Sequence, residues 1–464
     1  MTSRRTLTRA VAVAVAVAVA VAVAVAAGAT ALAGCSVQSS STTTSTPTSS
    51  GTTSATGSTT PSASASASPT GPLRFGTVAP GVTASTIKIG IIYPDYASLA
   101  IYHININQGS FPEAYGAQIA KINAAGGIDG RKIVPVYAKF SLLNPAASTQ
   151  TCVQLTADDG VFAVLGTFES DTQALCYAQT HKTAVIGSTP SNADFALEQA
   201  PWFALDHGAD DAPSAIAAMS AGGRLTGKKV AVIALQQDAV TLDQGVIPAL
   251  KGEGITPVAT AVMTASTSDS TALGSEVAVA VQKFQSVGAN VVIVVGGMAP
   301  EYGPVETKTT YRPQLLFTSA SDVTAGLFGV KPDPTVYKNA LAADIVTNYN
   351  DPANLACVAT MEAAYPALKG KLVNPTSVPA GKPTLATSVD DACAELALFS
   401  DIAAKAGKDL NYGTFYQAGT TLGKVHIPSY SQDADFTATT PAGGLSDSLY
   451  TFSPTSSSFI AQGS

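Results

Sequence analysis

The sequence of 464 residues has few of the residue types that build metal sites or bind nucleic acid. Its four histidines are scattered without ligand spacing and no Cys-x-x-Cys motif occurs, which argues against a metal site. The formal net charge of −7 offers no basic excess for nucleic acid. Neither a Gly-x-Ser-x-Gly elbow nor a His-Glu-x-x-His motif is present. We therefore expect no metal, no cofactor, no nucleic-acid partner and no enzymatic activity.

Two features resemble catalytic motifs but do not fit them. Residues 222–229 come close to a phosphate-binding loop, yet they lack the final Ser or Thr and precede a predicted strand where the true motif follows one. The acid pairs are interpreted as solvated helix ends or loops, since adjacent carboxylates usually point apart; they are Asp158-Asp159, Asp210-Asp211 and Asp390-Asp391. A hydrolase remains the least favoured alternative.

A long hydrophobic run occurs once, at residues 10–27, between three arginines and the string Leu32-Ala33-Gly34-Cys35. This order is typical of a lipoprotein signal peptide, so residues 1–34 are predicted to be cleaved and Cys35 to be lipidated. A transmembrane anchor is the alternative, but it leaves the small residues around Cys35 unexplained. Cleavage removes three arginines and no acid, which takes the formal net charge from −7 to −10.

The stretch after Cys35 is almost wholly Ser, Thr, Ala, Pro and Gly up to residue 71. Such a composition cannot bury enough apolar surface to fold. Residues 35–81 are therefore predicted to be a disordered tether that anchors the folded part to the outer side of the cell membrane.

Four further cysteines, Cys152, Cys176, Cys357 and Cys393, follow in the body of the chain. An even number in an exported protein favours disulfides over a metal site. Three connectivities are possible. Cys152–Cys176 with Cys357–Cys393 is favoured because each pair closes a short stretch of chain.

The body alternates short β-branched runs with amphipathic stretches, which is typical of parallel strands joined by crossover helices. It is predicted to be an α/β protein with doubly wound sheets. A break at residues 206–211 separates two Rossmann-like lobes. The predicted strands are residues 87–93, 132–137, 161–165, 184–186, 229–235, 258–262, 289–295 and 314–317, and the helices include 112–125, 146–156, 212–221, 244–252 and 275–287.

The predicted helix-to-strand turn at residues 122–133 has the sequence INAAGGIDGRKI. In an exported α/β chain, this string resembles extracytoplasmic solute-binding proteins of the branched-chain amino acid and amide type, with the periplasmic binding protein type I fold. Residues 229–245, 287–293 and 441–452 extend the resemblance over nearly the whole body, and the Cys152–Cys176 spacing also matches relatives. The resemblance implies two lobes joined by a three-strand hinge. We assign residues 82–208 and 344–427 to the first lobe, and 209–343 and 428–464 to the second.

In this family, ligands bind where the carboxyl ends of strands face the cleft, as expected for open parallel sheets. The resemblance assigns the ligand carboxylate to the segment with Ser170, Asp171 and Thr172, where free helix amides would face it. Helix capping explains Ser170 and Asp171 equally well. Further predicted contacts in the first lobe are Ser188, Thr189 and an aromatic wall at Tyr102.

The second lobe departs from the family's pattern. Thr241 and Met298 stand where relatives that bind amino acids commonly place aromatic residues. Asp322, after Ser321, matches the acid that holds a ligand ammonium, but it fits a helix cap as well. If Asp322 is a cap, the ligand need not be an amino acid.

The resemblance thus predicts a monomer that captures a small polar solute, an amino acid, amide or related compound, and delivers it to an ABC permease. The alternative from another class is a surface ligand sensor or structural lipoprotein that has the same fold but no transporter.

Overall fold

The computed structural model describes residues 73–102, 105–169, 171–206, 212–266, 269–296, 298–327, 332–378, 382–455 and 457–462. The predicted signal peptide, Cys35 and the tether up to residue 72 lie outside this part of the chain. The tether was predicted to extend to residue 81, but Arg74 forms an ion pair with Glu198 and Phe75 packs against Tyr416, so residues 73–81 belong to the first lobe. Within it, no helix is both long enough and apolar enough to cross a bilayer.

The first lobe is built on a five-stranded sheet in which all neighbouring strands are parallel. Its strands are short runs of β-branched and other apolar residues, and the two central ones, β3 and β4, are completely buried, as expected for a sheet covered on both faces. In spatial order the strands are β2 (Lys132–Phe140), β1 (Thr86–Pro94), β3 (Ala163–Gly166), β4 (Ala184–Ile186) and β5 (Trp202–Phe203).

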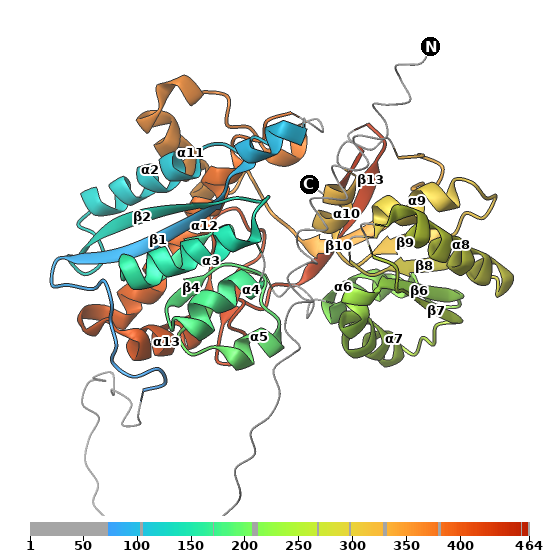
Figure 1. Ribbon diagram of the computed structural model, residues 1–464, viewed down its shortest axis with the longest axis horizontal. Helices are drawn as coiled ribbons and strands as arrows, with labels where there is room; N and C mark the ends of the chain where they lie inside the picture. The colour runs from blue at the N-terminus through green and yellow to red at the C-terminus, as the bar shows by residue number, and fades with distance from the viewer. Residues whose placement is uncertain are drawn as a thin grey trace, which may run out of the picture.

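Helices cover both faces of this sheet (Figure 1). One face packs against four helices that form the larger core: α2 (Phe111–Ala124), α11 (Pro352–Ala364), α12 (Thr387–Ala406) and α13 (Tyr412–Thr420). The other face packs against α3 (Pro145–Val153), α4 (Asp171–Leu175) and α5 (Asn192–Leu197). A two-stranded antiparallel sheet, β11 (Gly423–Val425) with β12 (Ala434–Phe436), joins the larger core.

The second lobe is built on a seven-stranded sheet that is parallel except at one side, where β13 and β14 run antiparallel. In spatial order its strands are β14 (Ser458–Ala461), β13 (Asp447–Ser453), β10 (Leu341–Ile345), β9 (Gln314–Phe317), β8 (Val291–Val294), β6 (Val230–Leu235) and β7 (Ala259–Met263). One face carries α8 (Ser270–Ser286), α9 (Ala299–Glu306) and α10 (Ala320–Gly326), and the other carries α6 (Ala212–Ser220) and α7 (Ile247–Gly252).

The chain passes between the two sheets three times: after β5, after β10 and before β13. The first passage includes residues 207–211, which lie outside the described residues. Beside the second passage, the backbone N–H of Asn348 donates to the carbonyl oxygen of Ser429 at 2.6 Å. Thr347 and Tyr430 pair there as an isolated antiparallel β-bridge. The predicted architecture of two α/β lobes joined by three passages of the chain is confirmed.

The lobe boundaries differ from those expected at residues 344 and 428. Strand β10 continues to Ile345 in the second sheet. Ala434, Phe436 and Leu445 pack in the core of the first lobe, so the third passage lies between Leu445 and Asp447. The reason is that strands as short as β11 and β12 carry no local signal for the sheet they join.

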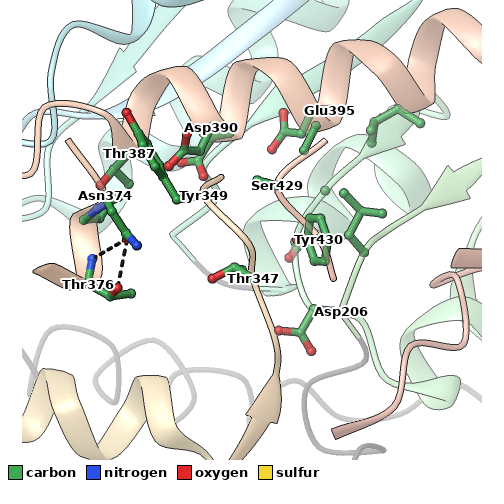
Figure 2. Close-up of a pocket in the computed structure, with 17 residues that line it drawn as sticks. Asp206, Thr347, Tyr349, Asn374, Thr376, Thr387, Asp390, Glu395, Ser429 and Tyr430 are labelled. Atoms are coloured by element: carbon green, nitrogen blue, oxygen red, sulfur yellow. Dashed lines mark hydrogen bonds between the residues drawn. The ribbon is translucent and has the colours of Figure 1, made fainter. Parts of the chain in front are cut away.

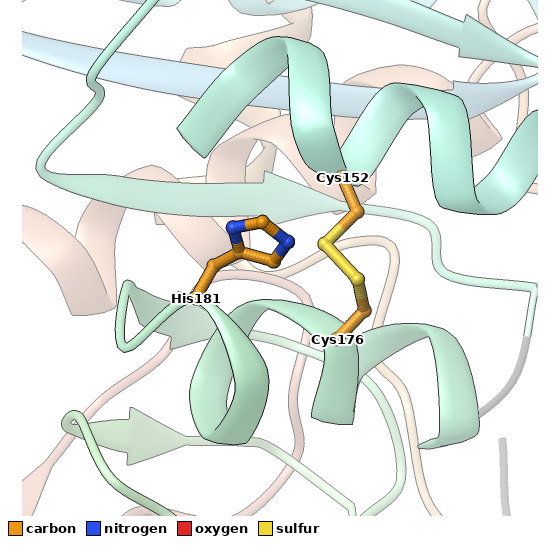
Figure 3. A group of neighbouring side chains, drawn as sticks. All are labelled: Cys152, Cys176 and His181. Atoms are coloured by element: carbon orange, nitrogen blue, oxygen red, sulfur yellow. A yellow bond between two sulfur atoms is a disulfide. The ribbon is translucent and has the colours of Figure 1, made fainter. Parts of the chain in front are cut away.

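The structure contains two disulfides, Cys152–Cys176 and Cys357–Cys393, with Cα–Cα distances of 6.3 and 6.1 Å. The first links α3 to the turn after α4, and His181 lies beside it (Figure 3). The two sulfur atoms are bonded to each other, so no thiolate is available to bind a metal with His181. The second disulfide links α11 to α12 on the other face of the same sheet.

Candidate functional site

A cavity of about 290 Å³ lies where the chain passes between the lobes (Figure 2). Its walls come from the residues that follow β4 and β5, from the segment after β10, from the first half of α12, and from residues 374–376 and 429–430. The carboxyl ends of parallel strands in open α/β sheets are where ligands of this architecture bind. The polar lining residues are Ser188, Asp206, Thr347, Tyr349, Asn374, Thr376, Thr387, Asp390, Asp391, Glu395, Ser429 and Tyr430.

The turn after β4 approaches α12 closely because of a glycine. Gly187 has φ of +119°, and a Cβ atom there would lie 3.3 Å from Oε1 of Glu395. The buried Trp202 fixes this turn from the next strand, since its Nε1 donates to the carbonyl oxygen of Gly187 at 3.0 Å. Ser188 follows with φ of +64° and lines the cavity.

Three carboxyl groups, Asp390, Asp391 and Glu395, which we call the α12 acids, line the cavity from one helix. Asp391 and Glu395 are four residues apart and therefore share a helix face. Tyr115, fully buried on α2, donates its hydroxyl to Oε2 of Glu395 at 2.6 Å. Figure 2 shows Asp390 and Glu395 projecting from α12 into the pocket.

Burial controls the protonation of the α12 acids. It raises the pKa of Asp390 to about 7 and, helped by repulsion from Asp390, that of Asp391 to about 7. Burial raises the pKa of Glu395 to about 8, although the hydrogen bond from Tyr115 opposes the shift. The three groups are therefore not all ionised together at neutral pH.

Further acids of the second lobe lie near the same passages and interact with Asp206 of the cavity. Burial raises the pKa of Asp344, which accepts the N–H of Ser321 at 2.8 Å, and Asp206 adds to the shift. Burial, followed by repulsion from Asp344, raises the pKa of Asp447 to about 7. Asp322 is partly accessible to solvent, yet desolvation by the surrounding protein raises its pKa. Repulsion from Asp206 adds to this shift, and a hydrogen bond with Ser319 opposes it.

The predicted contacts of the first lobe divide into two groups. Ser188 lines the cavity, whereas Thr189 and Thr172 are exposed and do not line it. Asp171 is the first residue of the five-residue helix α4, and Tyr102 ends the 3-10 helix Tyr96–Tyr102. Ser170 and the side chains of Asp171 and Tyr102 lie outside the described part of the chain.

The predicted contacts of the second lobe do not line the cavity. Met298 is 0 % exposed and packs in the core next to α9, so it cannot contact a ligand. Thr241 is half-buried at the start of a π-helical turn, Thr241–Val246. Ser321 and Asp322 lie in the first turn of α10, where Ser319 caps the helix by accepting the N–H of Asp322 at 3.1 Å.

The α12 acids are among the lining residues that sequence reasoning missed. Asp390-Asp391 was interpreted as a solvated pair, but the structure places both residues inside a helix and against the cavity. The sequence did contain a signal for this helix, because the apolar residues between 389 and 403 recur with the period of a helix. A helix there places Asp391 and Glu395 on one face.

Two α/β lobes with a polar cavity at their connections define a two-lobed solute-binding protein. The chain belongs to the periplasmic binding protein family, whose sequence model matches residues 86–381. The resemblance to ABC-transporter substrate-binding proteins of the branched-chain amino acid type is thereby confirmed. No curated protein sequence matches the chain.

Solved structures with the same fold are distant in sequence. A fatty acid ABC transporter substrate-binding protein from Thermomonospora curvata is 16% identical, with a TM-score of 0.56 over 83% of this chain and 93% of its own. The branched-chain amino acid transporter substrate binding protein of Streptococcus pneumoniae, in complex with isoleucine, is 16% identical, with a TM-score of 0.51 over 81% and 98%. A solute binding protein from R. palustris, in complex with 4-hydroxybenzoate, is 16% identical, with a TM-score of 0.55 over 82% and 96%. At these identities the likeness establishes the fold alone.

Proposed function

We propose that this protein captures a small polar solute between its lobes and delivers it to the permease of an ABC importer. The observation that carries the proposal is the position of the cavity, at the carboxyl ends of β4 and β5 and beside the second passage between the lobes. A ligand held there and touched by both lobes favours their closure by its differential affinity for the closed form. The protein acts as a monomer in this proposal, because each chain has both lobes.

A screen of amino acids, amides, ureas, amines, small carboxylic acids and nucleosides should identify a solute that raises the melting temperature. Stabilisation follows mass action, so a solute at 100 times its dissociation constant adds about 2.7 kcal/mol to the free energy of unfolding. Small-angle scattering should report a smaller radius of gyration with the same solute, because the lobes close on it.

Filling the cavity supplies the matched test. Ala394 lines the cavity, so Ala394→Trp should abolish the solute-induced thermal shift. Ala404 is exposed on the same helix, and Ala404→Trp should leave the shift unchanged. An undiminished shift in Ala394→Trp, or no shift with any solute, would contradict the proposal.

Delivery to a permease is tested in cells. Deletion of the gene should abolish uptake of the radiolabelled solute that binds in vitro. Undiminished uptake, together with binding, would favour a surface sensor of the same fold instead.

We also propose that the protein is held at the outer face of the cell membrane by lipid on Cys35. The Cys35→Ala protein should leave the membrane fraction and appear in the medium or remain unprocessed, because diacylation is the attachment inferred here. Fractionation after salt and carbonate washes measures this, and Cys35→Ala protein that stays in the membrane would refute the lipid anchor.

A further inference from the structure

We propose that the solute is an organic cation without a carboxylate group, an amine or amidinium compound whose positive charge is bound by the α12 acids. This inference rests on the proposed solute-binding function and specifies the ligand class of the same cavity. Every described lining residue with a formal charge is acidic: Asp206, Asp390, Asp391 and Glu395. No lysine, arginine or histidine is among the described lining residues.

The carboxylate of Asp391 provides an independent sign of a missing partner. Asp391 is half-buried, it lines the cavity, and no hydrogen bond or ion pair joins it to the rest of the described chain. Next to it, Oδ1 of Asp390 is inaccessible and has no hydrogen-bond partner, although the Asn354 side chain hydrogen-bonds to the same carboxyl group. A buried carboxylate oxygen without a partner is costly, and here it lies beside a cavity that can admit one. An ammonium or amidinium group would supply the missing donors and charge.

A ligand carboxylate meets the opposite conditions in this cavity. It would oppose the ionisation of the α12 acids, with no described cation to pair with it, and contacts between like charges are unfavourable at low dielectric. The acids of the second lobe, Asp322 and Asp344, interact with Asp206 and extend the same sign of charge across the passage. Closure of the lobes therefore brings more negative charge toward the ligand and selects for a cation.

The arrangement fits an organic cation better than a metal ion. A metal needs several oxygen ligands around one point, at about 2.0–2.6 Å from the ion. In the described part of the chain, no three carboxylates bring oxygen atoms within 4.8 Å of one another. Tyr349 and Tyr430 also line the cavity, and aromatic faces attract organic ammonium groups.

Ligands that share one carbon skeleton and differ in charge test the inference. Isothermal titration calorimetry would compare 3-methylbutylamine, 4-methylpentanoate and leucine, with 1,4-diaminobutane and agmatine as larger cations. The best cation should bind at least about 30-fold more tightly than 4-methylpentanoate and leucine, from the cost of leaving a buried charge unpaired. Calcium and magnesium chloride are titrated in parallel.

The matched variants assign the effect to the α12 acids. The Asp390→Asn/Asp391→Asn double variant should bind the same cation at least about 10-fold more weakly. Asp401 is exposed on the same helix outside the cavity, and Asp401→Asn should bind the cation with unchanged affinity. If the double variant does not fold, the ligand series with the unaltered protein decides the question alone.

Each outcome has a defined meaning. Tighter binding of 4-methylpentanoate or leucine than of every amine overturns the cation inference and leaves the solute-binding function standing. Saturable binding of calcium or magnesium without binding of amines also overturns it. Unchanged cation affinity in the double variant overturns the assignment to the α12 acids. Absence of binding by all of these compounds, together with a negative solute screen, overturns both proposals.

Discussion

The Gly166→Ala variant is expected to lose more than about 4 kcal/mol of folding free energy, which is exceptional for the addition of one methyl group. Gly166 ends β3 at the cavity edge of the first sheet with φ of +122°, and a Cβ atom there would lie 2.0 Å from the carbonyl oxygen of Ile92. That oxygen belongs to the backbone of the neighbouring strand, so no side-chain rotation can relieve the clash. Trp202, the only tryptophan of the chain, lies in the same sheet, so its fluorescence in urea titrations reports unfolding of this lobe.

Gly126→Ala is the matched control for backbone conformation. Gly126 has a similar φ of +111°, but nothing lies within 4 Å of the position that its Cβ would occupy. This variant should lose only about 1–2 kcal/mol, the cost of a left-handed conformation for an L-residue. Equal losses in the two variants would show that the contact with Ile92 does not determine the requirement for glycine at residue 166.

The Glu306→Gln variant is expected to be more stable than the unaltered protein at pH 8 and nearly equal to it at pH 5. Glu306 on α9 is 0 % exposed, and neither carboxylate oxygen has a hydrogen-bond partner. Burial raises its pKa from 4.5 to about 8, although Arg312 lowers it. Between these values the folded protein keeps the proton that the unfolded chain releases, so stability falls as pH rises. The loss is about 1.4 kcal/mol per pH unit, or about 3 kcal/mol by pH 7.

Glutamine has the same shape and no charge to desolvate, so this pH dependence should disappear in denaturation curves followed by circular dichroism at pH 5, 6, 7 and 8. Glu276→Gln in the same lobe provides a control of opposite sign. The pKa of Glu276 is lowered by hydrogen bonds from the Ala265 and Thr264 backbone and from the Thr264 side chain. Glu276 therefore stabilises the fold above its unfolded pKa, and its replacement should destabilise the protein at pH 7. If the free energy of unfolding depends on pH equally in Glu306→Gln and in the unaltered protein from pH 5 to pH 8, Glu306 is not the source of the pH dependence.

The elements of the α/β fold with a strong local pattern could be predicted from the sequence. The runs expected at residues 132–137 and 184–186 correspond to β2 (Lys132–Phe140) and β4 (Ala184–Ile186). Strand β5 (Trp202–Phe203) was not predicted, because two residues are too few to display a period. Likewise, α12 was not predicted, although the pattern of its buried face, including Val389, Leu396 and Phe399, is helical.

The site could be predicted less well than the fold, and Met298 and Asp390 illustrate the reason. Met298 was predicted as a ligand contact from its place in the family's pattern, and Asp390 as part of a solvated pair from its neighbour in the sequence. The structure buries Met298 in a core and sets Asp390 against the cavity. Whether a side chain meets solvent, core or ligand depends on segments far away in the chain, which a local pattern does not contain.

The sequence by itself determined the alternation of strands and helices, because hydrophobic period and turn residues act over a few residues. It also showed the family, through the resemblance of strings such as residues 122–133 and the match of the family model over residues 86–381. Only the tertiary structure decided which acids share the cavity. Asp206 follows β5, whereas Asp390 and Glu395 lie on α12, nearly two hundred residues later. They meet because the chain returns from the second lobe and packs α12 on the first sheet, beside the carboxyl ends of its strands. Packing between distant segments of the chain therefore brings these acids together and buries them, and the burial raises their pKa values.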